Sequence, residues 1–179
     1  MESPNDGHRR RPIAAAGLGL FLTGCSLFGS DVQPPCPRLA IVNDAASITQ
    51  FRDGPGRDLT DVRYEGYIVG VSQTCEYDSD GFVDVTVAVN MVLTRGPAAE
   101  DETGSFVYFV ALTNPEGKIV TKETLPVTVT FPSGAKRLRL RDEVSEHIVF
   151  APAPDAHAWR SFVGFQLTPE QLKYRRGQE

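Results

Sequence analysis

Two histidines are the first candidates for proton-transfer chemistry in this chain. Beyond residue 24 the sequence has His147 and His157 as its histidines, and it has no Gly-x-Ser-x-Gly turn of the kind that exposes a catalytic serine. A hydrolase needs a nucleophile with a base within hydrogen-bonding reach. Asp155 lies two residues before His157, but such pairs occur by chance in polar loops. We therefore interpret both histidines as surface residues and predict no catalytic residue.

Carboxylates around one turn raise the alternative of a calcium site. Asp78, Asp80 and Asp84 surround Gly81, and alternate carboxylates with a nearby glycine can wrap a hard cation. An EF-hand loop also needs a late bidentate Glu, which this sequence lacks. The stretch therefore predicts a plain hairpin turn, and we predict no metal and no cofactor.

A third reactive group, the thiol of Cys25, follows a segment with the order of a signal peptide. Arg9 to Arg11 form a positive region, and the 11 residues from Pro12 to Leu22 are apolar and uncharged. A bilayer core takes about 20 apolar residues, so this run is too short to span it. Small residues at Thr23 and Gly24 then favour entry into a peptidase groove.

The tetrad Leu22-Thr23-Gly24-Cys25 resembles the lipobox of bacterial lipoproteins, which is a Leu, two small residues and an obligatory Cys. The resemblance covers the leader alone. It implies that the Cys25 thiol takes a diacylglyceryl group, that residues 1–24 are removed, and that the new amino group is acylated, for example with palmitate. Several acyl chains at about 0.8 kcal/mol per buried CH₂ would make the anchor stable. The alternative is an ordinary secretory leader.

Residue 26 refines the location that the resemblance implies. In Gram-negative lipoproteins an Asp at this position favours retention at the inner membrane, whereas this chain has Ser26. The resemblance thus implies the outer membrane, on its periplasmic side. Residues 25–35 are rich in Gly, Ser, Asp and Pro and are predicted to be a tether. At about 3 Å per extended residue, it would reach roughly 30 Å.

Composition then bounds the rest of the chain, residues 36–179, to one domain. The leader holds three arginines and two acidic residues, so the chain from Cys25 has 15 basic and 21 acidic side chains and a net charge of −6. An acidic total argues against nucleic acid as a partner, because phosphate binding needs a basic surface.

With Cys25 assigned to lipid, Cys36 and Cys75 remain as a pair in an oxidising compartment, and we predict a disulfide between them. Two free thiols are the alternative.

Residues 36–167 show the period of two that is typical of strands. In the clearest strand, Val83 to Leu93, every second residue is apolar. Val62 to Tyr77 is predicted to pair with it as a hairpin. We expect one face of that first strand to carry Tyr67, Val69, Val71, Cys75 and Tyr77.

Further strands follow at short intervals. Phe106 to Thr113 is apolar on both faces and is predicted to lie in the middle of a sheet, paired through a turn with Lys118 to Thr121. A second hairpin is predicted from Val127 to Phe131 and Arg137 to Arg141. The remaining predicted strands are Leu39 to Val42, Ile48 to Phe51, Val144 to Phe150 and Trp159 to Leu167.

This pattern of about eight strands predicts an all-β fold, an immunoglobulin-like antiparallel β-sandwich, with Trp159 against the core. The likeness is architectural, because the spacing of Cys and Trp differs from that of true immunoglobulin domains. Thr168, with Pro169 after it and Gln171 three residues on, predicts a short terminal helix to about Tyr174.

One charged feature is a candidate binding surface. Arg137, Arg139 and Arg141 share one face of a predicted strand, and Lys173, Arg175 and Arg176 lie near the end of the chain. Together they would form a basic patch for lipid head groups or an acidic partner. The alternative is protection of an exposed strand edge against aggregation.

The sequence thus predicts a non-catalytic lipoprotein of the cell envelope, anchored in the membrane through its N-terminal lipid. Its expected role is structural, or the binding of an envelope protein or cell-wall component. The alternatives are an envelope enzyme acting on cell wall or lipid, which would need two carboxylates facing each other in a cleft, and a small-ligand carrier, which would need a closed barrel with an apolar cavity.

Overall fold

A computed structural model describes residues 36–77, 82–149 and 158–177 of the chain. They form eight strands, two 3₁₀ turns and one α-helix. In chain order these are β1 (Arg38–Ile41), η1 (Asn43–Ala45), β2 (Ser47–Phe51), η2 (Leu59–Asp61), β3 (Val62–Tyr77), β4 (Phe82–Arg95), β5 (Thr103–Thr113), β6 (Ile119–Thr130), β7 (Arg137–Val149), β8 (Arg160–Phe165) and α1 (Pro169–Arg176).

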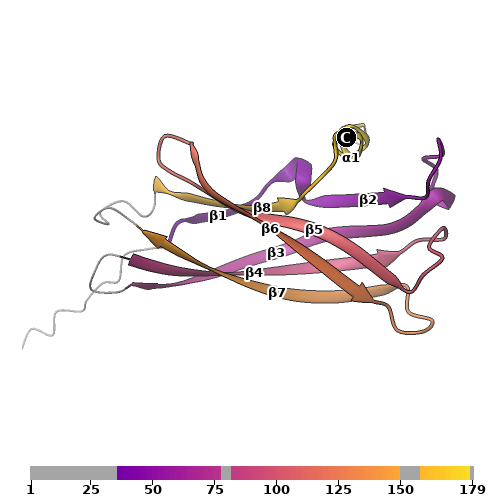
Figure 1. Cartoon of the computed structure of the whole chain (residues 1–179), viewed down its shortest axis with the longest axis horizontal. Coiled ribbons are helices and arrows are strands. Elements are labelled where there is room, and N and C mark those ends of the chain that lie inside the picture. Colours follow the sequence, from indigo (N-terminus) through magenta and orange to yellow (C-terminus); the bar gives the residue numbers. More distant parts are fainter. Residues whose placement is uncertain (1–35, 78–81, 150–157, 178–179) are drawn as a thin grey trace, which may run out of the picture. The chain divides into compact units, whose positions relative to one another are not determined.

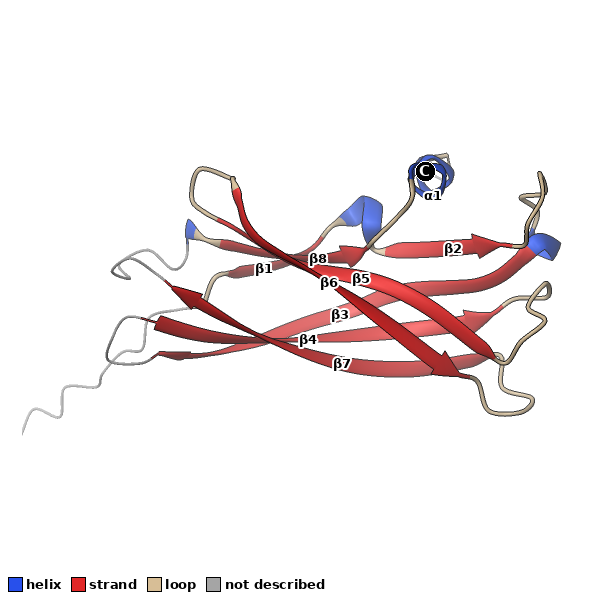
Figure 2. Cartoon of the chain, in the orientation of Figure 1, coloured by secondary structure: helices blue, strands red, loops and turns tan. Residues whose placement is uncertain are grey.

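The strands make two four-stranded sheets packed face to face (Figures 1 and 2). Sheet A has the order β1-β8-β5-β6, and sheet B has the order β2-β3-β4-β7. Strand pairs are antiparallel except for β1, which runs parallel to β8. The predicted all-β sandwich of about eight strands with a short C-terminal helix is therefore confirmed.

Strand β4 contributes a row of buried residues from sheet B to the core. Its inward residues, each at most 1 % exposed, are Val83, Val85, Val87, Val89, Met91 and Leu93. Asp84 and Thr86 point outward, as the period of two predicts. Strand β5 lies between β8 and β6 and supplies Phe106, Tyr108 and Val110 from the opposite layer, which confirms its predicted place in the middle of a sheet. Trp159 packs against the same core.

Strand β3 departs from the prediction that Tyr67, Val69, Val71, Cys75 and Tyr77 share one face. Ile68 pairs with Met91 and Gly70 pairs with Asn90, so Val69 is an extra residue that forms a β-bulge. The bulge exchanges the two faces of the strand. Tyr67 and Val69 are consequently exposed, whereas Val71, Cys75 and Tyr77 pack against the core.

The segment after β5 also differs from prediction. Lys118–Thr121 and Val127–Phe131 were expected as separate strands, but one strand, β6, runs from Ile119 to Thr130. Its turn with β5 is the predicted one, with Thr113 opposite Ile119. The predicted hairpin between Val127–Phe131 and Arg137–Arg141 is wrong, because β6 pairs with β5 in sheet A and β7 pairs with β4 in sheet B. The turn at Pro132 carries the chain from one sheet to the other.

Helix α1 begins as predicted. The Thr168 hydroxyl accepts a hydrogen bond from the Gln171 N–H at 3.2 Å, and the Gln171 side chain accepts one from the Thr168 N–H at 2.8 Å. At its other end, the Arg176 guanidinium donates to Asp44 of η1 at 2.6 Å. The contact with Asp44 holds the end of α1 against η1, and the helix lies beside strand β2 (Figure 1). Among the described residues, no helix is long and apolar enough to cross a bilayer.

Candidate functional site

The predicted cysteine pair is joined where the chain enters the domain. Cys36, just before β1, forms a disulfide with Cys75 near the end of β3, with the two Cα atoms 5.8 Å apart, so the predicted Cys36–Cys75 bridge is confirmed. The Gln73 side chain also donates a hydrogen bond to the Pro37 carbonyl. Two links therefore fix the start of sheet A to the end of β3. Cys25 and the rest of the predicted leader and tether lie outside the described residues.

An exposed apolar patch lies on the outer face of sheet B, about 23 Å along the strands from that disulfide. We define the Tyr67 patch as Tyr67, Val69 and Val92. Tyr67 is 41 % and Val69 57 % exposed, because the bulge turns them outward. Val92 lies directly opposite Tyr67 on β4 and is 8 % exposed. Tyrosine beside aliphatic residues on a surface is a common composition for protein interfaces.

The predicted arginines border the Tyr67 patch along β7. Arg137, Arg139 and Arg141 are all exposed on the outer face, and the register places Arg139 directly opposite Val92. The Arg141 guanidinium pairs with Glu143 at 2.8 Å, and both side chains are more than half exposed. This leaves Arg137 and Arg139 without an ion pair among the described residues. The arginine row is thus a basic margin on an otherwise acidic protein.

The second predicted basic group, near the end of the chain, does not join this row. Lys173, Arg175 and Arg176 belong to α1, which lies beside β2, whereas the arginine row is on β7. Three strand spacings, roughly 14 Å, separate those two edges of sheet B. The two groups therefore flank the Tyr67 patch from opposite sides. Between α1 and the patch is a groove of about 530 Å³, whose lining includes Leu59, Glu65 and Tyr174.

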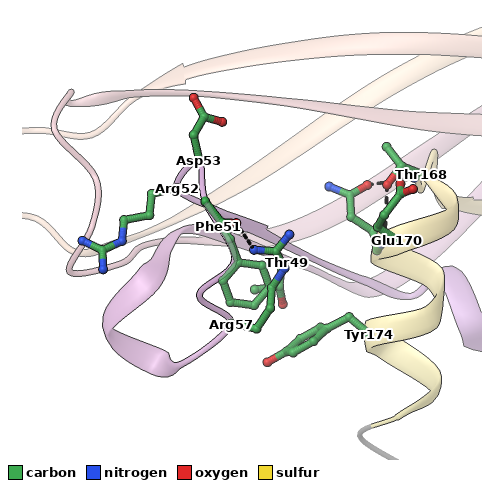
Figure 3. Close-up of a pocket in the computed structure, with 10 residues that line it drawn as sticks. Thr49, Phe51, Arg52, Asp53, Arg57, Thr168, Glu170 and Tyr174 are labelled. Atoms are coloured by element: carbon green, nitrogen blue, oxygen red, sulfur yellow. Dashed lines mark hydrogen bonds between the residues drawn. The ribbon is translucent and has the colours of Figure 1, made fainter.

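A neighbouring hollow of about 280 Å³ lies between α1 and the loop after β2 (Figure 3). Tyr174 packs edge-on against Phe51, with ring centroids 4.9 Å apart. The Arg57 guanidinium lies 5.2 Å from the Phe51 ring and donates hydrogen bonds to the carbonyls of Gly54 and Gly56. These contacts already engage the Phe51 ring and one nitrogen of the Arg57 guanidinium.

On the helix side of this hollow, two polar side chains are also already used in hydrogen bonds. Thr168 and Gln171 use their side chains in the helix cap. The Glu170 carboxylate is exposed, and its own backbone N–H and then the Thr168 side chain hold its pKa below the usual range. Glu170 is thus charged near neutral pH and poorly suited to general acid catalysis. We interpret the hollow as the joint between α1 and the sheet, which fixes the groove beside the Tyr67 patch.

Asp61 is a buried carboxylate that the sequence did not indicate. It accepts a hydrogen bond from the Asp58 N–H at 3.1 Å, and an Arg52 guanidinium nitrogen lies 2.5 Å from its Oδ1 atom. These contacts tie the loop after β2 to the start of β3. Aspartate three residues after a capping Asp was the available signal. Asp61 therefore has a structural role in shaping the loop that carries Leu59.

A second buried polar contact joins the two sheets beside β7. The Tyr108 hydroxyl donates to Asp142 Oδ2 at 3.0 Å. Burial raises the pKa of the Tyr108 phenol above its usual range, and the hydrogen bond to Asp142 raises this pKa further. The phenol consequently remains a donor at all physiological pH values. The contact fixes Asp142, and with it the inner side of β7, against sheet A.

Of the predicted histidines and turn carboxylates, His147 and Asp84 fall within the described residues. The His147 backbone lies opposite Asp84 in the pairing of β7 with β4, while His157, Asp155, Asp78 and Asp80 lie outside the described residues. No three His, Cys, Asp or Glu side chains of residues 36–77, 83–145 and 158–177 are grouped as metal ligands.

Tyr67 shows how a surface ring is tuned by its neighbours. Its hydroxyl lies 3.4 Å from Glu65 Oε1. Partial burial raises its pKa, and the charge of Glu65 raises this pKa further. The hydroxyl is therefore a neutral donor on the outer face, of the kind that interface tyrosines provide.

Neither protein-family models nor curated proteins give a match to this chain.

Proposed function

We propose that this chain is a lipid-anchored lipoprotein of the bacterial cell envelope, held at the periplasmic side of the outer membrane through Cys25. Its β-sandwich has a non-catalytic accessory role and binds another envelope protein or a cell-wall component. The lipobox-like tetrad followed by a Pro- and Gly-containing tether supports the anchor. The tether leads directly to Cys36, where the disulfide fixes the chain to the domain.

The observation that carries the binding role is the Tyr67 patch with its arginine row. Buried Tyr and Arg side chains dominate many protein interfaces, and this surface offers both beside an apolar centre. The patch lies about 23 Å along β3 and β4 from the disulfide. A domain anchored at Cys36 would therefore present this surface away from the point of attachment, where a partner can reach it.

The lipid anchor is tested by the mass of the N-terminus in membrane-extracted protein. We expect Cys25 as the first residue, with three acyl chains attached, and we expect Cys25→Ala to be uncleaved or released from the membrane. Ser26→Asp is the matched control for location, because it keeps the thiol and should move the protein to the inner-membrane fraction. An unmodified Cys25 in membrane-bound protein would contradict the proposal.

The binding role is tested by crosslinking and affinity purification from cells that make the lipidated protein. We expect a reproducible envelope partner whose recovery falls when Tyr67→Ser and Val69→Thr are combined. Thr128→Ser on the outer face of sheet A is the control, because it alters an exposed strand residue away from the patch. Equal recovery of the partner with both variants would contradict a role for the patch.

A further inference from the structure

The two sheets have four edge strands, and they differ in how open they are to another strand. Strand β1 offers a four-residue edge. Strand β2 is five residues long and is bordered by α1 through the contact of Tyr174 with Phe51. Strand β6 is 12 residues long and contains Pro126, and β7 is 13 residues long and has no proline.

Pro126 interrupts the open side of β6. It pairs with Val107, whose carbonyl accepts a hydrogen bond from the Gln166 N–H at 2.8 Å on the far side of β5. Both backbone polar groups of a residue in an antiparallel strand point to the same side, so Val107 and Pro126 form a non-hydrogen-bonded pair. The missing N–H of Pro126 therefore falls on the free edge. This edge lacks a donor that an added strand would need.

The backbone of β7 presents hydrogen-bonding groups at its free edge from Arg137 to Arg141, whereas the Glu143 N–H at the same edge already donates to Asp142. The Arg95 N–H donates to the Lys136 carbonyl at 2.8 Å, and the register continues as Thr94 opposite Arg137. Even-numbered residues of β7 thus bond to β4, and odd-numbered ones face away from it. The Glu143 N–H, which donates to the Asp142 carboxylate at 3.1 Å, is consistent with this alternation.

The same three residues provide both the edge and the charge. Arg137, Arg139 and Arg141 turn their backbone N–H and C=O groups to the free edge, and their exposed side chains lie on the outer face of sheet B. Successive arginines are about 7 Å apart along the strand. A strand added here places every second side chain directly opposite an arginine. Opposite charges in such cross-strand positions stabilise pairing.

We propose that β7 binds an extended acidic segment of another envelope protein by strand addition, with carboxylates at alternate positions opposite Arg137, Arg139 and Arg141. Main-chain hydrogen bonds hold the segment to the edge, and the arginine row selects for alternating acidic residues. The inference rests on the proposed binding function and names the chemistry of the partner. The added strand extends sheet B on the side of β7 away from the Tyr67 patch.

Pairing of β7 with a second copy of itself fits the charges less well. An antiparallel pair centred on Arg141 places that arginine opposite its own copy, and a pair centred on Leu140 places Arg139 opposite Arg141. A pair centred on Asp142 places Arg141 opposite Glu143 but leaves Arg137 and Arg139 with no carboxylate opposite them. Like charges directly opposite destabilise a strand pair. An acidic segment places no like charge opposite any member of the row.

The test uses the full chain in a nonionic detergent and a ten-residue peptide that alternates threonine with glutamate. We expect the alternating peptide to bind at least about tenfold more tightly than either of two controls. One control has glutamine in place of glutamate, and the other has five threonines followed by five glutamates. Equal affinity for the alternating and block-charged peptides would overturn strand addition. Self-association of the chain through β7 that excludes the peptide would overturn it as well.

Amide hydrogen exchange measures which backbone N–H groups of β7 the bound peptide protects. Bound peptide should slow exchange at Arg137, Arg139 and Arg141 by at least about tenfold, while Leu138 and Leu140, which already bond to β4, should change little. This alternation is specific to a strand added at the edge. Uniform protection, or none, would overturn the proposal, even if the peptide binds.

Variants separate the charge from the backbone. Arg139→Gln should weaken binding roughly two- to fivefold, as expected for one exposed ion pair, and Arg139→Pro should weaken it further because it also removes an edge N–H. Arg160→Gln is the matched control, since it removes an exposed arginine from sheet A and should leave affinity unchanged. If Arg139→Pro fails to fold, a variant with all three arginines replaced by glutamate tests the proposal instead. That variant should no longer bind the peptide that alternates threonine with glutamate, and it should bind a peptide that alternates threonine with lysine.

Failure of this inference is distinguishable from failure of the proposed function. The peptide experiments do not depend on acylation of Cys25, so an unmodified Cys25 would leave their outcome unchanged. Conversely, a null result with the peptide leaves crosslinking to a partner through the Tyr67 patch as an independent measurement.

Discussion

Strands β3 and β4 are neighbours in sheet B, yet they use their residues differently. Strand β4 keeps one face inward from Val83 to Leu93. Strand β3 changes parity at Val69: Tyr64 and Ile68 point into the core before the bulge and Val71 and Cys75 pack against it afterwards, while Tyr67 and Val69 point to the solvent. Both strands contribute to the core, and the interrupted one also exposes two apolar side chains. A single extra residue is enough to convert core-type side chains into a candidate binding patch.

The largest effect is expected from breaking the regular strand. Val87→Asp places a carboxylate without partners in the core, at a cost of several kcal/mol, comparable with the whole stability of a domain of this size. Thr86→Asp is the control on the outer face, where the change removes one exposed hydrogen bond to Ser145. We expect the first to prevent folding and the second to be nearly silent in soluble yield and thermal melting. Equal behaviour of the two variants would mean that the faces are misassigned.

The next effect concerns the second half of β3, which the disulfide fixes. Replacing both Cys36 and Cys75 by Ser opens a loop spanning 39 residues of sequence separation. The loop-closure model gives a loss of about 4 kcal/mol, and measured losses are often smaller. Chemical denaturation of oxidised and doubly substituted protein, prepared without residues 1–24, measures this difference. Reductant should lower the stability of the parent to the same level and leave the variant unchanged.

The smallest effect is expected from removing the β-bulge, which tests whether the bulge is needed to expose the Tyr67 patch. Deleting Val69 leaves Ile68 and Gly70 opposite Met91 and Asn90, so each inward residue of β3 stays inward. We expect a change of about 1 kcal/mol or less in the free energy of unfolding, together with weaker recovery of the proposed partner. Deleting Thr86 is the matched comparison, since it turns one half of β4 inside out and should abolish folding. Similar tolerance of both deletions would show that register in β4 is not fixed by the core.

The elements predicted well from sequence are those with local signals. The alternation in Val83–Leu93 and the turn before Ile119 specify a strand and a hairpin without reference to distant residues. The Thr168 cap does the same for α1. The disulfide followed from the cysteine count once the lipobox resemblance assigned Cys25.

The features missed depend on partners far away in the sequence. The bulge at Val69 leaves the segment apolar on both sides, so a strict period of two assigned Tyr67 to the core. Three successive large apolar residues, from Tyr67 to Val69, were the available signal. The turn at Pro132 predicts a change of direction but not which sheet the chain enters next, and Pro126 is tolerated because β6 is an edge strand.

The candidate site was predicted in part for the same reason. The arginine row follows from alternation along one strand, whereas its position beside Tyr67 depends on the pairing of three strands. The separation of the row from Arg175 and Arg176 depends on where α1 packs. Sequence therefore predicted the charges and not the surface that they border.

The disulfide also determines how mechanical tension would travel through the domain. A pull on the chain ahead of Cys36 passes through the sulfur bridge to Cys75 on β3, as well as into the four residues of β1. Hydrogen bonds between β1 and β8 are therefore spared most of the load, and peeling from that end is resisted covalently. Because β3 and β7 belong to the same sheet, tension between the proposed anchor and the proposed partner at β7 would run within one layer. The two layers would then not have to shear past each other under load.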